Sequence, residues 1–487
     1  MTQELNRRRF LWNSLAAAAM GAAASGMGSC AREAAPPERP NILFLFTDDQ
    51  RFSTVNALNN KAVRTPTMDG LVAKGTAFTR AHIMGGTVGA VCAPSRAMML
   101  TGQTLFHVHD SLIQPNDGPD SVAKPFDLYP EILRKAGYRS FGTGKWHNGP
   151  ATYARCFTDG ANIFFGGMSD HLQVPIQDFD PSGAYPKSRQ RMGEKFSSEL
   201  FSDAAVQFLE NYQSDQPFFA YVSYTAPHDP RMAPKDYAEM YPPESIEVPE
   251  NFLPEHPFDN GEMKIRDEML APFPRTAEVV KENIAAYYAM ITHVDAQMGR
   301  VLEALERTGK ARNTIVIFAA DNGLALGQHG LMGKQNLYEH SVRVPMVIGG
   351  PGIPAGHTRD AFVYLFDLFP TLCELAGLPV PGSVEGKSLV ATIADNTPVR
   401  DSVFYAYRDI QRGVCTGRWK LILYQVNGKE TTQLFDLESD PLEMKNLAEL
   451  DAHAEHVKEL RARLKEWMLN TQDKLDIDKP GWGKAVA

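Results

Sequence analysis

The sequence is short of cysteine, of long apolar runs and of net positive charge, and each shortage excludes a class of protein. Five cysteines in 487 residues are too few for a disulfide scaffold. No stretch beyond residue 40 holds about 18 consecutive apolar residues, so nothing there can span a membrane. The net charge of −9 argues against a nucleic-acid partner. What remains is a globular chain, 43% hydrophobic and 22% charged, long enough for one large domain and a smaller one.

The first 30 residues are predicted to be an export segment. Arg7–Leu11 reads RRRFL, a twin-arginine pattern of the kind that the bacterial exporter of folded proteins recognises. The weakly apolar stretch Leu15–Met27 that follows is too short and too rich in small residues for a stable transmembrane helix. We therefore expect the twin-arginine machinery to carry the chain to the periplasm of a Gram-negative-type bacterium.

Cys30 is the candidate for a lipid anchor. Met27–Cys30 reads MGSC, which resembles a lipoprotein cleavage box. The mature chain would then begin at a lipidated Cys30 and be tethered to the outer membrane through the linker 31–40. The alternative is an ordinary signal peptide cut near Ala22–Ser25, with Cys30 incidental.

From residue 41 onward, short apolar runs alternate with amphipathic stretches. This alternation predicts β-α-β units and an α/β fold with a large, mostly parallel sheet and helices on both faces. His293 and Asp295 fall at helical spacing in a long helix, where packing and capping are the expected roles. The proline-rich stretch 227–275 is expected to be a surface excursion. The expected strands are 41–46, 138–141, 218–224, 314–319 and 345–348, with helices near 130–136 and over 279–308.

The pattern changes near residue 395. Strands over 402–408, 413–424 and 433–437 and a closing helix over 453–469 predict a smaller antiparallel sheet with one helix packed on it. We therefore expect a catalytic domain over 41–395 and a C-terminal subdomain over 396–487.

Polar residues follow four of the expected strands. In an open α/β sheet, ligands bind outside the carboxyl ends of the strands, so these residues are expected to share one cleft. Each group alone has a structural explanation, since Asp-Asn-Gly is a good tight turn and histidines often serve packing. The residues are Asp48 and Asp49, then Lys145 and His147, then His228, then Asp321 and Asn322.

The chemistry of this predicted cleft is rich in oxygen. Three carboxylates and an amide suit Ca²⁺ or Mg²⁺ better than Zn²⁺, which prefers histidine and cysteine. Lys145, Lys334 and Arg96 add positive charge. A divalent metal ion together with several cations predicts a site for a small multivalent oxyanion.

Cys92 opens the most specific motif. Cys92–Arg96 reads CAPSR, and Pro94 near the start of an Ala/Met/Leu-rich helix places Cys92 at the helix N-terminus. Free N–H groups and the positive end of the helix dipole favour anions at such a position. A thiolate nucleophile there is consistent with these physical preferences.

This motif resembles the signature of the formylglycine-dependent type I sulfatases, a family of the alkaline phosphatase superfamily. The similarity extends from residue 39 to about 450, and no core position departs from the family pattern. It implies a bacterial, exported, carbohydrate-type sulfatase, a sulfuric ester hydrolase of polysaccharide degradation. The matching blocks are Asn41–Asp49, Gly144–His147, Pro227-His228, Asp321–Gly323, Gly330–Lys334, Tyr338-Glu339, Arg343–Pro345, Gly417–Leu421 and Leu434–Leu437.

The resemblance also implies the cofactors. Cys92 would be oxidised to formylglycine by a formylglycine-generating enzyme during maturation. One Ca²⁺, or Mg²⁺, would bind residue 92 together with the four oxygen ligands Asp48, Asp49, Asp321 and Asn322.

The catalytic roles that the resemblance implies fall on five further residues. One hydroxyl of the hydrated aldehyde would attack sulfur, and His228, with Lys334 nearby, would protonate the departing oxygen. His147 would accept the proton of the second hydroxyl, so that sulfate is expelled. Arg96 and Lys145 would hold the formylglycine oxygens and screen charge.

Two other functions stay open at this point. A phosphate or phosphonate ester hydrolase of the same superfamily would share the metal site, because a fold alone does not fix function. A non-catalytic, glycan-binding surface lipoprotein is the second alternative. A copy that has lost activity would be expected to lack Cys92, His228 or a carboxylate, and this chain keeps them all.

Sulfated glycan fragments are the expected substrate of an exported sulfatase. The candidate substrate contacts are His107 and His109, Arg231, Gln328 and His329, each of which has a supporting role as its alternative.

Three further cysteines have no assigned chemistry. Cys156, Cys373 and Cys415 allow at most one disulfide, and Cys373 is expected to be a buried free thiol.

Overall fold

The computed structural model describes residues 39–114 and 126–483. The predicted export segment and the Cys30 anchor lie outside these residues and stay predictions. Arg39–Ala487 forms one compact unit. No helix in the described ranges combines the length and apolar character needed to cross a bilayer.

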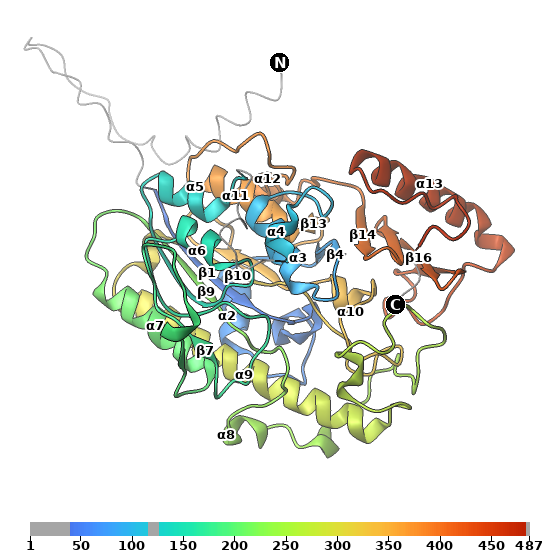
Figure 1. Cartoon of the computed structure of the whole chain (residues 1–487), viewed down its shortest axis with the longest axis horizontal. Helices are drawn as coiled ribbons and strands as arrows, with labels where there is room; N and C mark the ends of the chain where they lie inside the picture. The colour runs from blue at the N-terminus through green and yellow to red at the C-terminus, as the bar shows by residue number, and fades with distance from the viewer. Residues whose placement is uncertain (1–38, 115–125, 484–487) are drawn as a thin grey trace, which may run out of the picture. The chain divides into compact units, whose positions relative to one another are not determined.

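The centre of the fold is an eight-stranded sheet in the order β12-β2-β11-β10-β1-β9-β5-β6 (Figure 1). From β10 through β1, β9 and β5 to β6, each strand is parallel to the next, which confirms the predicted α/β class. The antiparallel β11 joins this part to the edge pair β2 and β12. The strands are β1 (Asn41–Thr47), β2 (Gly75–Phe78), β5 (Arg139–Lys145), β6 (Asp159–Phe164), β9 (Phe218–Ser223), β10 (Thr314–Ala320), β11 (Met346–Gly349) and β12 (His357–Arg359).

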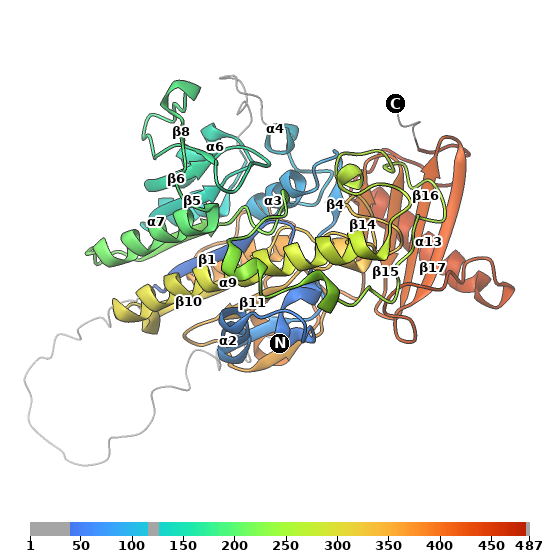
Figure 2. The ribbon, with the colours of Figure 1, turned by 90° about the horizontal axis from the view of Figure 1, so that it is seen from below.

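Successive side chains of each central strand point to opposite faces of the sheet, so both faces carry apolar side chains. Helices cover both of these apolar faces. In β1, Phe44 and Phe46 pack on one face, while Leu43 and Leu45 pack on the other. Helices α3 (Cys92–Thr101), α5 (Tyr129–Lys135) and α11 (Leu368–Leu375) belong to the first layer. Helices α2 (Pro66–Lys74), α7 (Ser197–Asn211) and α9 (Ala277–Arg307) belong to the second (Figure 2).

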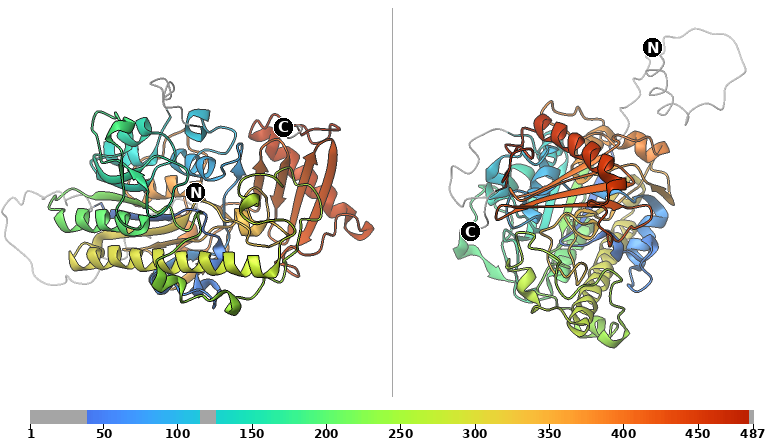
Figure 3. Two further views of the ribbon diagram at one scale, coloured as in Figure 1. Left: turned by 60° about the horizontal axis from the view of Figure 1, so that its bottom comes forward. Right: turned by 90° about the vertical axis from the view of Figure 1, so that its right-hand side faces the viewer.

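A second, five-stranded sheet contains the last strands of the chain (Figure 3). Helix α13 (Ala454–Asn470) packs Leu460, Leu464 and Met468 against it. The predicted single strand 413–424 is wrong: Gly417 has a positive φ of 93°, and the chain turns there between two strands. The strands are β4 (Gly85–Gly86), β14 (Val403–Tyr407), β15 (Gln411–Cys415), β16 (Trp419–Val426) and β17 (Lys429–Asp436).

The long helix α9 confirms the roles expected for His293 and Asp295. The His293 ring is fully buried and lies edge-on to Phe196, with ring centroids 4.6 Å apart. The Asp295 carboxylate accepts hydrogen bonds from the backbone N–H groups of Thr67 (3.0 Å) and Met68 (2.8 Å), so it caps the start of α2.

Much of the segment between β9 and α9 is exposed, as expected of a surface excursion. It contains only short helical turns, α8 (Lys235–Ala238), η4 (Pro243–Ser245) and η5 (Glu268–Leu270). Several of its charged side chains are nevertheless buried, among them Asp267, Glu268 and Arg275. A buried charge needs a partner, so the segment is built into the molecule at these points.

Candidate active site

The carboxyl ends of β10, β1, β9 and β5 bring the predicted polar residues to one place. These strands are neighbours and run parallel, so the residues that follow them meet at the same edge of the sheet. One ligand atom from each of four buried side chains lies within 4.8 Å of the other three, and these side chains are Asp48, Asp49, Cys92 and His228.

Helix α3 begins at Cys92, as the motif predicted. Two residues of its first turn fix the helix to the end of β10: Ser95 Oγ donates to the Asp321 carbonyl oxygen (2.6 Å), and Arg96 Nε donates to Asp321 Oδ2 (2.8 Å). The Cys92 side chain is 2% exposed, and its Sγ lies 3.6 Å from Lys334 Nζ. The cysteine is therefore held at the floor of the site, beside a cation.

Each of the three site carboxylates has a basic partner. Lys334 Nζ contacts both oxygens of Asp49, at 2.7 and 2.8 Å. Lys145 Nζ donates to Asp48 Oδ2, and the third pair is Arg96 with Asp321. Arg96 and Lys145 thus neutralise part of the carboxylate charge.

Two oxygen atoms of the site have no hydrogen-bond donor although they are buried: Asp48 Oδ1 and Asn322 Oδ1. Asn322 donates its Nδ2 to Asp49 Oδ1 (2.7 Å), which leaves its oxygen free of that contact. Burial raises the pKa of Asp48, and the negative charge of Asp321 raises it further. Unsatisfied buried oxygens and crowded carboxylates are unfavourable alone, and a hard divalent cation satisfies both. The donor set therefore fits Ca²⁺ or Mg²⁺.

The titratable groups around Cys92 favour its ionised form. Burial alone would raise the pKa of the thiol, but Lys145 and Lys334, together with hydrogen bonds involving His147 and His228, hold that pKa well below its ordinary value.

The two site histidines are tuned in opposite directions. Burial would lower the pKa of His228, but the carboxylate of Asp49, 3.5 Å from its Nε2, together with Asp48 and a hydrogen bond involving Cys92, raises the pKa to about 9. Burial and the charge of Lys145 lower the pKa of His147, whose Nδ1 is buried without a partner. One ring is thus suited to give a proton and the other to accept one.

The structure does not gather the predicted substrate contacts with this cluster. His107 Nδ1 lies 2.8 Å from Glu385 Oε1, and His109 accepts a hydrogen bond from the Ser111 N–H and caps a short helix. His329 stacks on Tyr338, with ring centroids 4.1 Å apart.

Gln328 and Arg231 have different surroundings. The Gln328 Oε1 accepts the Leu326 N–H (2.6 Å), within the turn before Lys334. Arg231 donates to Asn283 Oδ1 (2.6 Å), and its Nε is buried without a partner. Arg231 is close enough to Asp229 and Asp49 for their charges to affect its pKa. It remains the strongest of these predicted substrate contacts.

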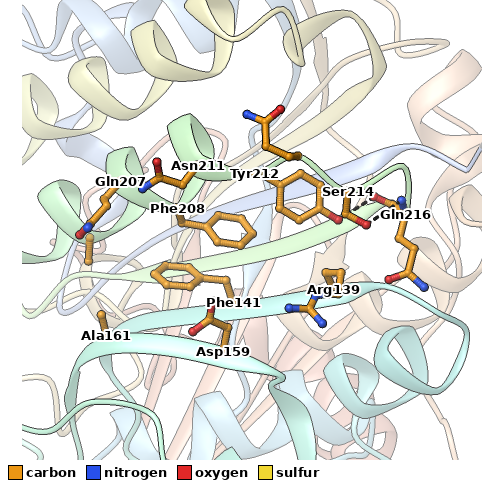
Figure 4. Close-up of a pocket in the computed structure, with 12 residues that line it drawn as sticks. Arg139, Phe141, Asp159, Ala161, Gln207, Phe208, Asn211, Tyr212, Ser214 and Gln216 are labelled. Carbon is orange, nitrogen blue, oxygen red and sulfur yellow. Dashed lines mark hydrogen bonds between the residues drawn. The ribbon is translucent and has the colours of Figure 1, made fainter.

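A groove of about 600 Å³ elsewhere in the molecule does not belong to the site (Figure 4). It is lined by Arg139 and by the stacked rings of Phe141 and Phe208. Arg139 is the first residue of β5 and Lys145 the last, so the groove and the catalytic cluster lie about 20 Å apart along the strand.

Sequence reasoning missed the residues that support the catalytic side chains. Asp229, which follows His228, bonds to Arg266, and Gln335, which follows Lys334, bonds to Asp267. Their positions next to predicted catalytic residues were the only available signal.

The other cysteines within residues 39–114 and 126–483 are free. Cys156, Cys373 and Cys415 are buried and unpaired, as expected for Cys373.

Comparisons with known proteins agree with this geometry. The sulfatase family profile matches residues 40–378, and that of the N-sulphoglucosamine sulphohydrolase C-terminal region matches 327–470. A sulfatase of Formosa agariphila is 29% identical over 465 residues, covering 88% of this chain and 86% of its own. An N-acetylglucosamine-6-O-sulfatase of Bacteroides thetaiotaomicron is 27% identical over 524 residues, covering 93% and 90%.

Solved structures share the fold. A protein in complex with its substrate D-glucosamine-2-N,6-O-disulfate superposes with a TM-score of 0.73 at 24% identity, covering 91% of this chain and 99% of its own. A phosphonate monoester hydrolase of Agrobacterium radiobacter gives a TM-score of 0.68 at 23% identity, covering 89% and 96%.

A mostly parallel sheet whose strand ends surround a helix N-terminal cysteine with carboxylates and cations defines a protein of the alkaline phosphatase-like fold class. Within that class, the chain belongs to the sulfatase family, and it is a sulfuric ester hydrolase.

Proposed function

We propose that this enzyme removes sulfate from a sulfated glycan or glycan fragment, using formylglycine made from Cys92 and a bound Ca²⁺. The observation that carries the proposal is the position of Cys92 at the start of α3, beside Lys334 and in one buried cluster with Asp48, Asp49 and His228. The relative that is named as an N-acetylglucosamine-6-O-sulfatase supports an amino-sugar sulfate as substrate.

The proposed cofactors occupy the centre of the site. When bound, the ion supplies Lewis-acid stabilisation of the negative charge on the sulfate oxygens. Hydrated formylglycine supplies a hydroxyl nucleophile and a second hydroxyl through which sulfate can leave without attack by water at sulfur. The proposed ligands of the ion are residue 92 and the oxygen groups Asp48, Asp49, Asp321 and Asn322.

His228 and Lys334 serve the leaving oxygen in this proposal. Both side chains face Asp49, with His228 Nε2 3.5 Å and Lys334 Nζ 2.7 Å from its carboxylate. The raised pKa keeps His228 protonated near neutral pH, so its Nε2 can donate a proton to the sugar oxygen as that oxygen departs. The Lys334 ammonium holds the negative charge on the same side of the site.

His147 acts on the opposite half of the reaction. Its pKa is lowered and its Nδ1 has no partner, so the ring is neutral and can accept a proton from the nucleophile. Lys145 and Arg96 stay paired with Asp48 and Asp321 and hold those carboxylates in place. Arg231, His107, Gln328 and His329 remain the proposed sugar contacts.

Two measurements test this function. The protein is co-expressed with a formylglycine-generating enzyme, and mass spectrometry of the peptide containing Cys92 is expected to show the aldehyde. Release of sulfate from D-glucosamine 6-sulfate is then compared with release of phosphate from 4-nitrophenyl phosphate and of phosphonate from its phenyl ester. An unmodified cysteine would contradict the mechanism. Preferred turnover of the phosphorus esters would contradict a sulfate ester as the substrate and favour a phosphate or phosphonate ester instead.

Export and anchoring form a separate proposal. We infer from the twin-arginine pattern and the MGSC box that the chain is exported and lipidated at Cys30. The Cys30→Ala variant is expected to move from the membrane fraction to the soluble fraction. A variant that stays membrane-bound would contradict the anchor.

A further inference from the structure

Three consecutive residues of the segment between β9 and α9 contact both sides of the catalytic cluster. Arg266, Asp267 and Glu268 bond to the chain around His228 and to the chain around Lys334. His228 and Lys334 come from distant parts of the sequence, so the distance between their side chains must be fixed by contacts with other residues of the fold.

Glu268 holds the backbone that precedes Lys334. Its Oε2 accepts the Met332 N–H (2.8 Å), and its Oε1 accepts the Gly333 N–H (2.8 Å). Arg275 Nη2 donates to Oε2 (2.7 Å) and neutralises the carboxylate. Glu268 and Arg275 are each 2% exposed. Charge-assisted bonds to consecutive N–H groups fix both the position and the direction of this stretch of chain.

Asp267 holds the residue that follows Lys334. Gln335 donates its Nε2 to Asp267 Oδ2 (2.6 Å) and to the Gly89 carbonyl oxygen (3.0 Å), in the loop just before Cys92. The Gln335 Oε1 accepts the Lys334 N–H (3.0 Å). The backbone of the lysine is therefore fixed on both sides and tied to the loop that carries the cysteine.

Arg266 reaches the other side of the site. Its Nη2 donates to Asp229 Oδ1 (3.0 Å), its Nη1 donates to Asp229 Oδ2, and its Nη2 also contacts Asp267. Asp229 Oδ1 lies 3.3 Å from His228 Nδ1, and the Asp229 carbonyl oxygen accepts from the same nitrogen (2.9 Å). This pairing orients the ring so that Nε2 faces Asp49.

We propose that Arg266-Asp267-Glu268 is a positioning element that sets where His228 Nε2 and Lys334 Nζ stand relative to the departing oxygen. The inference rests on the proposed roles of His228 and Lys334. Lysine has a flexible four-carbon stem, so its ammonium is only as well placed as the backbone beneath it. A misplacement of about 1 Å can cost about 10²-fold in rate.

The variant Glu268→Gln tests this positioning. The substitution keeps the size of the side chain but presents an NH₂ group to a backbone N–H or to Arg275. The control is Glu131→Gln, which also breaks an ion pair, with Arg155 on α6 (Pro150–Cys156), at 2.6 Å, but a partly exposed one that touches no catalytic residue. Both proteins are prepared with the formylglycine-generating enzyme, and their melting temperatures are recorded.

The leaving group separates positioning from general damage. A sugar alkoxide needs a proton as it departs, whereas 4-nitrophenolate leaves readily without one. For Glu268→Gln we expect kcat on D-glucosamine 6-sulfate to fall by about 10- to 100-fold with KM changed less than about threefold, and the loss on 4-nitrophenyl sulfate to be about tenfold smaller. Glu131→Gln is expected to keep both rates within about twofold at a similar fall in melting temperature.

Equal losses on the two esters would overturn the positioning role, and so would an unchanged kcat in Glu268→Gln. Wild-type protein that carries formylglycine but cleaves neither ester would contradict the proposed function instead. In that case, crystal structures of both variants still test the positioning role. Displacement of Lys334 Nζ from Asp49 in Glu268→Gln alone supports it, and an unmoved Lys334 contradicts it.

Discussion

Cys92 is the residue on which the proposed chemistry depends. Removal of its side chain removes the precursor of the nucleophile, so Cys92→Ala is expected to lower sulfate release by at least about 10³-fold. Cys373→Ala is the matched control, because Cys373 is also a buried free thiol but lies on α11. It is expected to keep kcat and to lose only about 1 kcal/mol of stability. Similar activity losses in the two variants would show that the Cys92 effect is structural.

The unpartnered oxygens of Asp48 and Asn322 predict a metal requirement. Dialysis against a chelator is expected to abolish activity and to lower the melting temperature, because the carboxylates Asp48 and Asp49 then lose the cation that offsets their burial. Addition of Ca²⁺ is expected to restore both, and titration calorimetry with Ca²⁺ gives the affinity without an activity assay. Full activity and an unchanged melting temperature after chelation would contradict the metal site.

The clustering of the residues proposed to be catalytic could be predicted from the sequence, whereas their supports could not. Asp48, His228 and Asp321 follow strongly apolar runs, and the direction of parallel strands is enough to bring them together. Glu268 and Gln335 act only through a contact between distant parts of the chain. No spacing or composition encodes such a contact.

At the scale of elements, the central strands were predictable and the edges were not. β1, β9 and β10 are buried on both faces, so each is an uninterrupted apolar run. β12 is a three-residue edge strand and is largely exposed, so its sequence carries little signal. The hairpin of β15 and β16 was read as one strand because its turn is only three residues long.

The cap between α9 and α2 predicts a pH effect on stability. Burial raises the pKa of Asp295 to about 6, above its ordinary value of 3.8, although two N–H groups favour its charged form. The folded protein therefore binds this proton more tightly than the unfolded chain, and the contribution of Asp295 to the free energy of unfolding falls as pH rises from about 4 to 6, by up to about 3 kcal/mol.

The variant Asp295→Asn does not titrate and serves as the reference. As pH rises from 4 to 6, the melting temperature of the variant minus that of the wild type is expected to increase. Above pH 7 this difference is expected to stay constant. Parallel pH profiles for the two proteins would contradict the raised pKa.

At the scale of the whole molecule, one buried lysine joins the second sheet to the chain around the site. Lys420 on β16 is fully buried and contacts Glu339 on α10 (Glu339–Val342) and Glu443, each at 2.8 Å. Lys420→Met leaves two carboxylates without their cation and is expected to lower the free energy of unfolding by about 3–5 kcal/mol.

The control for this variant is Lys458→Met on α13, whose ion pair with Glu455 is exposed and is worth less than about 1 kcal/mol. Urea unfolding followed by tryptophan fluorescence measures both. Equal, small decreases in the free energy of unfolding for the two variants would show that Lys420 does not couple the second sheet to the rest of the molecule.

The one-to-one pairing of site carboxylates with basic side chains has a consequence for how a divalent cation and sulfate bind. The three acidic and three basic groups nearly cancel and the protonated His228 adds one positive charge, so these groups alone exert only a modest long-range pull on a dianion. An arriving divalent cation adds an excess of positive charge that these groups do not neutralise. We therefore expect a divalent cation and sulfate to bind cooperatively, each strengthening retention of the other by the same factor.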